Sequence, residues 1–146
     1  MSVDTVIPVL TAINAAITGV VRAYDTLPGS LNAADCPAML IIPGPAEQEQ
    51  ITLQGMLEER IYTLLVYVKP IALDKFNEAY NDARAFFRRV QEAYGAANRL
   101  NDLATVLDAH IVSDSGVQPL VYGQVQYAGI EFRLRVREMV GMTIDA

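Results

Sequence analysis

Alternating apolar and polar residues mark the clearest element of the chain, near its C-terminus. In residues 130–136 every even position is apolar, while Glu131, Arg133 and Arg135 occupy odd positions and Arg137 continues the polar series. A period of two is typical of a half-buried β-strand, because successive side chains point to opposite faces of a sheet. The pattern predicts a strand over 130–138 with one face on a core and three arginines on the other.

Two segments repeat apolar residues every three or four positions, which is the spacing of one helix face. The first repeat consists of Val6, Leu10, Ile13 and Ile17. We expect Asp4 to cap this helix and Gly19 to end it. The second repeat consists of Phe76, Tyr80, Ala83, Phe87, Val90 and Tyr94. It predicts a helix over 75–94, capped by Asp74 and ended by Gly95.

Further strands are predicted at 20–24, 38–42, 61–68 and 106–114. The second of these is apolar on both faces, which favours a place inside the sheet. The third is rich in β-branched and aromatic residues, which favours a central position. We expect Pro43-Gly44-Pro45 to end the 38–42 strand, and Ser115-Gly116 with Pro119 to form turns after the last one.

Residues 46–60 show only weak alternation, and we expect an extended, exposed hairpin or loop there. The acids of this segment are Glu47, Glu49, Glu58 and Glu59. Met56 and Leu57 place apolar side chains near its tip, where either a partner or the domain itself must cover them. Both possibilities stay open at this stage.

Strands arranged as hairpins, with helices grouped on one side, define an α+β domain. We therefore predict a single domain over 1–146, in which two main helices pack on one face of a mostly antiparallel sheet. A helix of about 30 Å and strands of eight or nine residues have nearly the same length, so the helix and the sheet are matched for packing.

Composition adds a hint of assembly. Apolar residues make up 52% of the 146-residue chain and charged residues only 19%, whereas ~25% charged is usual. A low charge content suggests surface that other subunits cover. The net charge of -6 argues against general nucleic-acid binding. The apolar runs are far shorter than the ~20 residues that span a bilayer, and no N-terminal targeting segment is apparent, so we expect no membrane contact.

Candidate chemistry is sparse. His110 is the only histidine, and the single cysteine, Cys36, is interpreted as a half-buried thiol rather than a nucleophile. Asp108, His110 and Ser113 include the residue types of a catalytic triad, but nothing marks the serine as activated. The pair Glu58-Glu59 would point to opposite sides of a strand and is interpreted as solvated. We predict no enzyme activity, no cofactor and no metal site.

Three features are better interpreted as contact surfaces. They are Met56 with Leu57, the arginines Arg84, Arg88 and Arg89 of the second helix, and the stripe Arg133, Arg135 and Arg137. Acids precede the helix arginines, an order that also suits a solvated face and the helix dipole. Three like charges about 7 Å apart repel one another unless acids lie opposite. A neighbouring strand, another subunit or nucleic acid could supply those acids.

The order of elements resembles the tail terminator, or tail completion, proteins of long-tailed bacteriophages and their relatives at the head-to-tail joint. The stretches most alike are Tyr24-Asp25-Thr26-Leu27-Pro28 with 40–43, and Tyr122-Gly123 with Tyr127-Ala128-Gly129 before the final strand. The resemblance implies an α+β virion subunit, made in the host cytoplasm, that forms a hexameric ring on the tail tube and docks it onto the head connector or adaptor protein. It carries no catalytic motif.

On this hypothesis an exposed element grips a neighbouring ring or subunit, and we expect that element to be Glu47 to Glu59, with Met56 and Leu57. The arginine stripe would form salt bridges between subunits or face DNA in the lumen without sequence specificity. Another neck or tail subunit, such as a head-closure or tube protein, is an alternative. A small enzyme or ligand-binding domain would instead need a deep pocket around His110, Tyr122 and Tyr127.

Overall fold

The computed structural model describes residues 2–50, 55–71 and 76–141, except for the side chains of Ser2 and Phe76. In chain order the elements are α1 (Ser2–Ala15), β1 (Arg22–Ala23), the 3-10 turn η1 (Ala33–Asp35), β2 (Ala38–Gln50), β3 (Gly55–Pro70), α2 (Phe76–Ala96), β4 (Val106–Tyr122) and β5 (Val125–Gly141).

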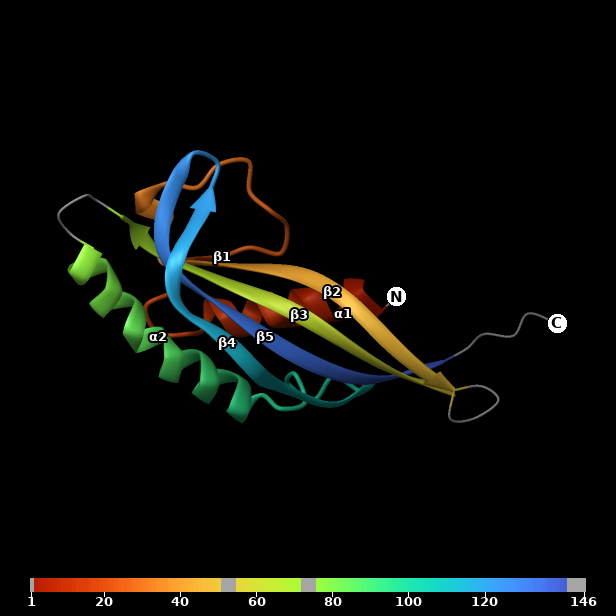
Figure 1. Cartoon of the computed structure of the whole chain (residues 1–146). Helices are drawn as coiled ribbons and strands as arrows, with labels where there is room; N and C mark the ends of the chain where they lie inside the picture. Colours follow the sequence, from red (N-terminus) through yellow and green to blue (C-terminus); the bar gives the residue numbers. More distant parts are fainter. Residues whose placement is uncertain (1, 51–54, 72–75, 142–146) are drawn as a thin grey trace.

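The strands form one sheet in the order β1-β2-β3-β5-β4, with α1 and α2 on the same face (Figure 1). β1 runs parallel to β2, and every other neighbouring pair is antiparallel. The predicted α+β class, with a mostly antiparallel sheet and helices on one face, is confirmed. No helix in the described part of the chain is long and apolar enough to cross a membrane.

The main core lies between the helices and the sheet. Ile130, Phe132 and Leu134 of β5 are fully buried there, as the alternation predicts. The helices contribute Val6, Leu10, Ile13, Ala83, Phe86, Val90 and Tyr94 to the same core. Burying each large apolar side chain contributes roughly 1.5–3 kcal/mol, so this layer supplies most of the driving force for folding.

The helix ends differ from the sequence-based predictions. α1 begins at Ser2, so Asp4 lies within the first turn and does not cap the helix. α1 ends at Ala15, before Gly19, which has a positive φ of 92° in the turn that follows. Gly95 does not end α2, because buried Tyr94 and a hydrogen bond from Ala97 N to Ala93 O hold the last turn. The predicted cap at position 74 lies outside the described residues.

Pro43-Gly44-Pro45 does not end β2, which continues to Gln50. β1 pairs only with Ala38 and Met39, so from residue 40 onward β2 is an edge strand in the described sheet. A proline is tolerated at an edge because no neighbouring strand needs its missing N–H. A register shift between Pro43 and Ala46 accommodates the segment. The prediction that 38–42 lies inside the sheet therefore holds only for its first two residues.

Ser115-Gly116 and Pro119 do not form the predicted turns, because β4 continues through them to Tyr122. A register shift between Asp114 and Val117 marks a bulge, where Gly116 has a φ of 73° and Glu131 N donates to Ser115 Oγ at 3.0 Å. A bulge adds a residue to one strand without ending the pairing. The chain reverses only after Tyr122, where Gly123 has a φ of 64°.

A second, smaller core lies on the opposite face of the sheet. Its buried residues are Leu31, Ala38, Leu40, Tyr67 and Tyr127. Tyr127 Oη donates to Leu31 O at 2.7 Å, and Tyr122 Oη donates to Pro28 O, so the 24–35 loop is fastened over this part of the sheet. The rest of this face carries no helix or loop among the described residues, and we call it the open face.

Candidate interaction surface

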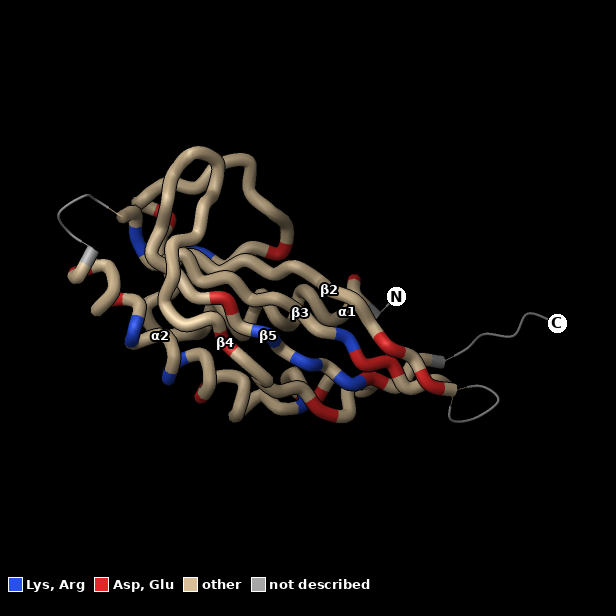
Figure 2. The backbone as a smooth tube through the Cα atoms, viewed as in Figure 1, with Lys and Arg blue, Asp and Glu red and all other residues tan. Residues whose placement is uncertain are grey.

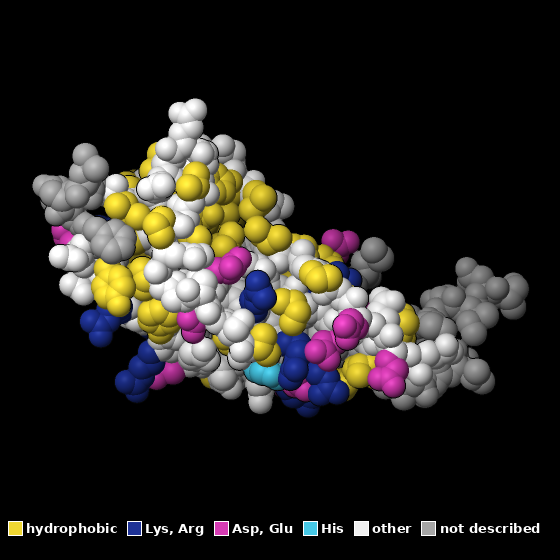
Figure 3. All heavy atoms as spheres, in the orientation of Figure 1, with side chains coloured by type: hydrophobic (Ala, Val, Ile, Leu, Met, Phe, Trp, Pro, Cys, Tyr) yellow, Lys and Arg dark blue, Asp and Glu magenta, His cyan; other side chains and the backbone are white. Residues whose placement is uncertain are grey.

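The predicted arginine stripe lies on the open face. Arg133, Arg135 and Arg137 alternate along β5 with side chains of the main core. Figure 3 shows basic side chains in dark blue close to acidic ones in magenta on this face. β3 and β4 flank β5 on its two sides, so each arginine can meet residues from either neighbour. The register decides which residues those are.

Acids from both flanking strands face two of the arginines. Arg137 Nη1 donates to Asp108 Oδ2 of β4 at 2.9 Å. Arg135 Nε lies 3.7 Å from Glu59 Oε1 of β3, and its Nη2 lies 2.7 Å from His110 Nε2. Neighbouring strands therefore supply the opposing charges for Arg135 and Arg137, which was one of the three sources considered from the sequence.

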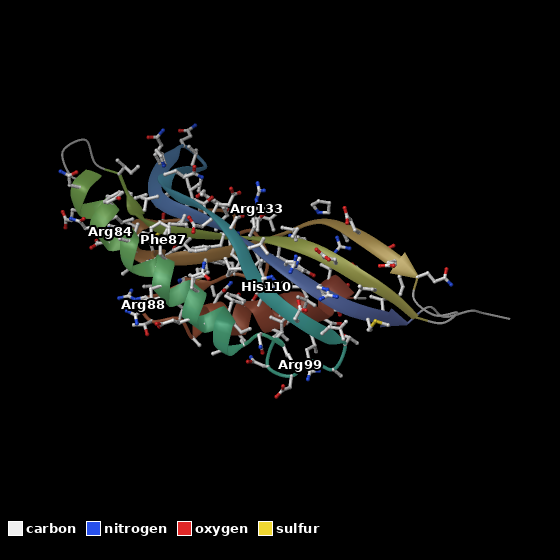
Figure 4. All side chains as sticks on the ribbon, turned by 60° about the horizontal axis from the view of Figure 1, so that its bottom comes forward. Arg84, Phe87, Arg88, Arg99, His110 and Arg133 are labelled. Carbon is white, nitrogen blue, oxygen red and sulfur yellow. The ribbon has the colours of Figure 1, made fainter. Side chains whose placement is uncertain are left out.

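Arg133 differs from the other two arginines. It is exposed and forms no hydrogen bond or ion pair with any described residue. It borders a hollow of about 400 Å³ whose other lining residues are Gly44, Pro45, Ile61, Thr63, Val112 and Ser113. Figure 4 labels Arg133, which lies apart from the arginines of α2. The hollow combines one free guanidinium with a mixed lining, which is apolar at Pro45, Ile61 and Val112 and carries hydroxyl groups at Thr63 and Ser113. This arrangement suits an acidic group of a partner.

The far ends of three strands form a projection that we call the arm, comprising 46–50, 55–60 and 136–141. β2, β3 and β5 continue past the N-terminus of α1 here (Figure 1). Met56 pairs with Val140 and Leu57 with Met139, and all four side chains are half-buried. The described parts of the predicted exposed segment, 46–50 and 55–60, are thus two paired strands, and 51–54 lies outside the described residues. Met56 and Leu57 lie in regular pairing within β3 rather than in a loop.

The arm separates the two neighbouring acids as the alternation predicts. Glu58 is only 5% exposed and accepts a 2.7 Å hydrogen bond from Arg60 Nη2. Glu138 lies opposite it, is equally buried, and accepts a hydrogen bond from Thr105 Oγ1 at 2.7 Å. The interpretation of this pair as solvated is therefore wrong for Glu58, which belongs to an interior polar cluster, whereas Glu59 is half-buried on the open face.

The exposed acids of the arm are Glu47 and Glu49 on β2. They share the open face with Glu59 and Leu57, since Glu47 pairs with Glu59 and Glu49 with Leu57. Neither acid of β2 forms an ion pair with a described residue. The outer edge of the arm therefore carries negative charge that nothing in the described molecule neutralises.

The exposed side of α2 is basic along its middle. Arg88 Nε donates to Glu92 Oε1 at 2.7 Å, and Arg89 Nη1 donates to Thr18 O at 3.2 Å. Arg84 is exposed and has no hydrogen-bond or ion-pair partner among the described residues. These arginines, with Asn81, Ala85 and Glu92, line an open hollow of about 590 Å³.

The residues considered for catalysis form no working triad. Asp108 and His110 share one face of β4, as predicted, but Asp108 Oδ1 and His110 Nδ1 are 3.8 Å apart, and His110 Nε2 faces Arg135. Burial raises the pKa of the Cys36 thiol to about 11, so the reactive thiolate is scarce at neutral pH. The described residues contain no group of three or more His, Cys, Asp or Glu side chains that could hold a metal ion.

A ligand-binding domain would need His110, Tyr122 and Tyr127 together, but only the two tyrosines are close to each other: both pack on Tyr67, and His110 lies elsewhere on the sheet. Arg135, which pairs with His110, and Tyr127 are eight positions apart on β5, about 26 Å of extended strand. The hydroxyl groups of Tyr122 and Tyr127 hold the 24–35 loop and belong to the smaller core.

Comparison with known proteins gives no assignment: no protein-family model matches the chain, and no curated protein matches it. Sequence reasoning missed the hollow at Arg133, because its lining comes from β2, β3, β4 and β5 and only the pairing register brings those residues together.

Proposed function

We propose that this protein is a non-enzymatic, ring-forming structural subunit of a bacteriophage tail or neck, which terminates the tail tube and joins it to the head connector. The resemblance that suggests this role depends on the order of elements, and the order in the structure is compatible with it. The chain forms a helix, a short strand, a loop, two long strands whose far ends make the acidic hairpin, a long helix and two closing strands. The mechanism is geometric, because the ring stops polymerisation of the tube and offers a new docking surface.

The strongest support for the proposal comes from the shape of the arm and from its partly exposed apolar side chains. It extends past α1, and its half-buried apolar pairs lie on both faces of the sheet, Met56 with Val140 on one and Leu57 with Met139 on the other. Apart from Val136 and the buried Glu58 and Glu138 at its base, the projection adds little to the core of its own domain. It is well suited to a contact with another subunit or with the next ring.

The edges of the sheet are compatible with controlled assembly. β2 beyond Met39 and the outer side of β4 have no strand partner among the described residues. Open edges pair readily with other chains unless something interrupts them. β4 is interrupted by three register shifts, and the free edge of β2 carries Pro43, Pro45 and acidic residues. Random edge pairing is thereby discouraged, while side-chain contacts through the arm remain possible.

Two experiments test the proposal. Native mass measurement at high micromolar concentration should give a closed oligomer, and a strictly monomeric protein would count heavily against a ring. Electron microscopy of particles made without this protein should show tails of uncontrolled length. Normal tails detached from full heads would instead indicate an adaptor or head-closure role within the same structural class.

A further inference from the structure

Two oppositely charged surfaces lie on different parts of the molecule. The acidic surface is the outer edge of the arm, with Glu47 and Glu49, and the basic surface is the exposed side of α2, with Arg84 and Arg88 (Figure 2). The arm lies at one end of the sheet, whereas α2 starts near the opposite end and stops short of the arm. One copy of the chain therefore cannot bring its own two surfaces together.

The acidic surface is destabilised by repulsion between its own carboxylates. Glu47 lies directly opposite Glu59 in the β2–β3 register, and like charges across a strand pair are destabilising. Glu59 has Arg135 at 3.7 Å on its other side, but neither Glu47 nor Glu49 has an ion-pair partner among the described residues. A basic partner at this edge would remove the repulsion.

The basic surface carries positive charge that is not fully neutralised, just as the acidic surface carries unneutralised negative charge. Arg84 and Arg88 are four positions apart on α2, where like charges repel. Arg88 is paired with Glu92, but the two side chains are 86% and 64% exposed, and such a pair contributes little and is easily exchanged. Arg84 has no partner within the described residues, and both arginines border the open hollow on α2 (Figure 4).

We propose that the arm of one copy docks on α2 of a second copy, with Glu47 and Glu49 facing Arg84 and Arg88. Two strand residues at i and i+2 are about 6.6 Å apart, and two helix residues at i and i+4 are about 6 Å apart along the axis, so the charges match in spacing as well as in sign. The contact joins different surfaces of identical chains, and such contacts form rings when the rotation closes. This inference rests on the proposed ring and identifies the surfaces that build it.

The experiment uses two complementary charge-reversed variants of the full chain. One carries Glu47→Lys with Glu49→Lys, and the other carries Arg84→Glu with Arg88→Glu. Each variant alone places like charges in every contact, so its association should weaken about tenfold or more. An equimolar mixture restores opposite charges in every arm-to-helix contact, and sedimentation velocity or native mass spectrometry should then detect an oligomer in which the two variants alternate.

Matched controls are Asp25→Lys and Arg99→Glu, which reverse exposed charges away from both surfaces and should assemble as the natural protein does. Normal assembly of both reversed variants would overturn the inference and leave the ring proposal intact. Weakened assembly that mixing does not restore would also overturn it, because the two surfaces then do not face each other. A natural protein that stays monomeric would contradict the ring proposal itself.

Discussion

Arg137 of β5 donates a 2.9 Å hydrogen bond to Asp108 of β4 across the open face of the sheet. The two residues are 29 positions apart in the chain, and only the antiparallel register brings them together. The contact explains how an arginine stripe persists in this sheet: the neighbouring strand provides the opposing charge. It also makes the contribution of each arginine separately measurable.

Arg137→Gln should lower the free energy of unfolding modestly, by about 0.5–1 kcal/mol, because the pair with Asp108 is partly exposed and solvent weakens it. Urea denaturation at low and high salt measures the effect. Arg133→Gln is the matched control and should change stability very little, since Arg133 has no ion-pair partner within the described residues. A double-mutant cycle with Asp108→Asn should show coupling for Arg137 and none for Arg133.

Replacing Arg133, Arg135 and Arg137 together by Gln should leave a folded protein that associates less well, if the stripe contributes to contacts between subunits. Circular dichroism checks the fold, and sedimentation velocity checks the oligomer. Unchanged assembly of a folded triple variant would indicate that the stripe is a solvated strand face whose charges are balanced within the sheet.

Gly129→Ala should destabilise the domain by about 1–3 kcal/mol, because a Cβ at this position would collide with Val66 O and with the side chain of Leu120. Gly95→Ala is the control with the opposite sign. Apart from the chain neighbours and the backbone of the helix itself, no atom lies within 4 Å of the Cβ position there, and alanine favours a helix over glycine by about 1 kcal/mol. Thermal unfolding should therefore shift down for the first variant and up for the second.

Tyr94→Phe should cost about 1–3 kcal/mol of stability. Tyr94 Oη donates to Asn14 Oδ1 at 2.5 Å in the main core, and Asn14 Nδ2 already has no hydrogen-bond partner. Removing the hydroxyl would leave both polar atoms of a buried amide unsatisfied. Adding Asn14→Leu to the same chain should recover much of the loss, and no recovery would mean that packing rather than hydrogen bonding determines the cost.

Stability should fall when the pH rises above about 10. Burial raises the pKa of Tyr94 and of Tyr62 above the ordinary value of 10.0, so the folded state keeps protons that the unfolded chain releases. The stabilisation from these hydroxyls is complete below the unfolded pKa and is lost as the pH rises toward the folded pKa. Each such tyrosine contributes a slope of up to about 1.4 kcal/mol per pH unit. Denaturation at pH 9 and 11 measures it, and Tyr94→Phe should reduce the slope.

Local patterns were sufficient to predict the class of fold. The period of two in 130–136 and the helical spacing of Val6, Leu10 and Ile13 identify which side chains enter the core, because burial selects the same face of an element wherever it packs. The same periodicity of apolar residues predicted that both helices and the long strands exist. Alternation along a strand likewise predicted the separation of Glu58 and Glu59 onto opposite faces of β3.

Element ends were harder to predict because they depend on neighbours that the local sequence does not reveal. Pro43 and Pro45 are compatible with β2 only because that part of the strand is a free edge. Ser115-Gly116 is a bulge rather than a turn because β5 continues alongside it, and Ser115 Oγ accepts the hydrogen bond from Glu131 N.

For the arginine stripe too, the sequence determined some features and the tertiary structure determined others. The sequence by itself determined that Arg133, Arg135 and Arg137 share one face of a strand, since alternation requires it. Only the tertiary structure decided that Asp108 and Glu59 meet two of these arginines while Arg133 faces an open hollow. The physical reason is that strand order and register, which are set by packing of the whole sheet against the helices, select each cross-strand partner.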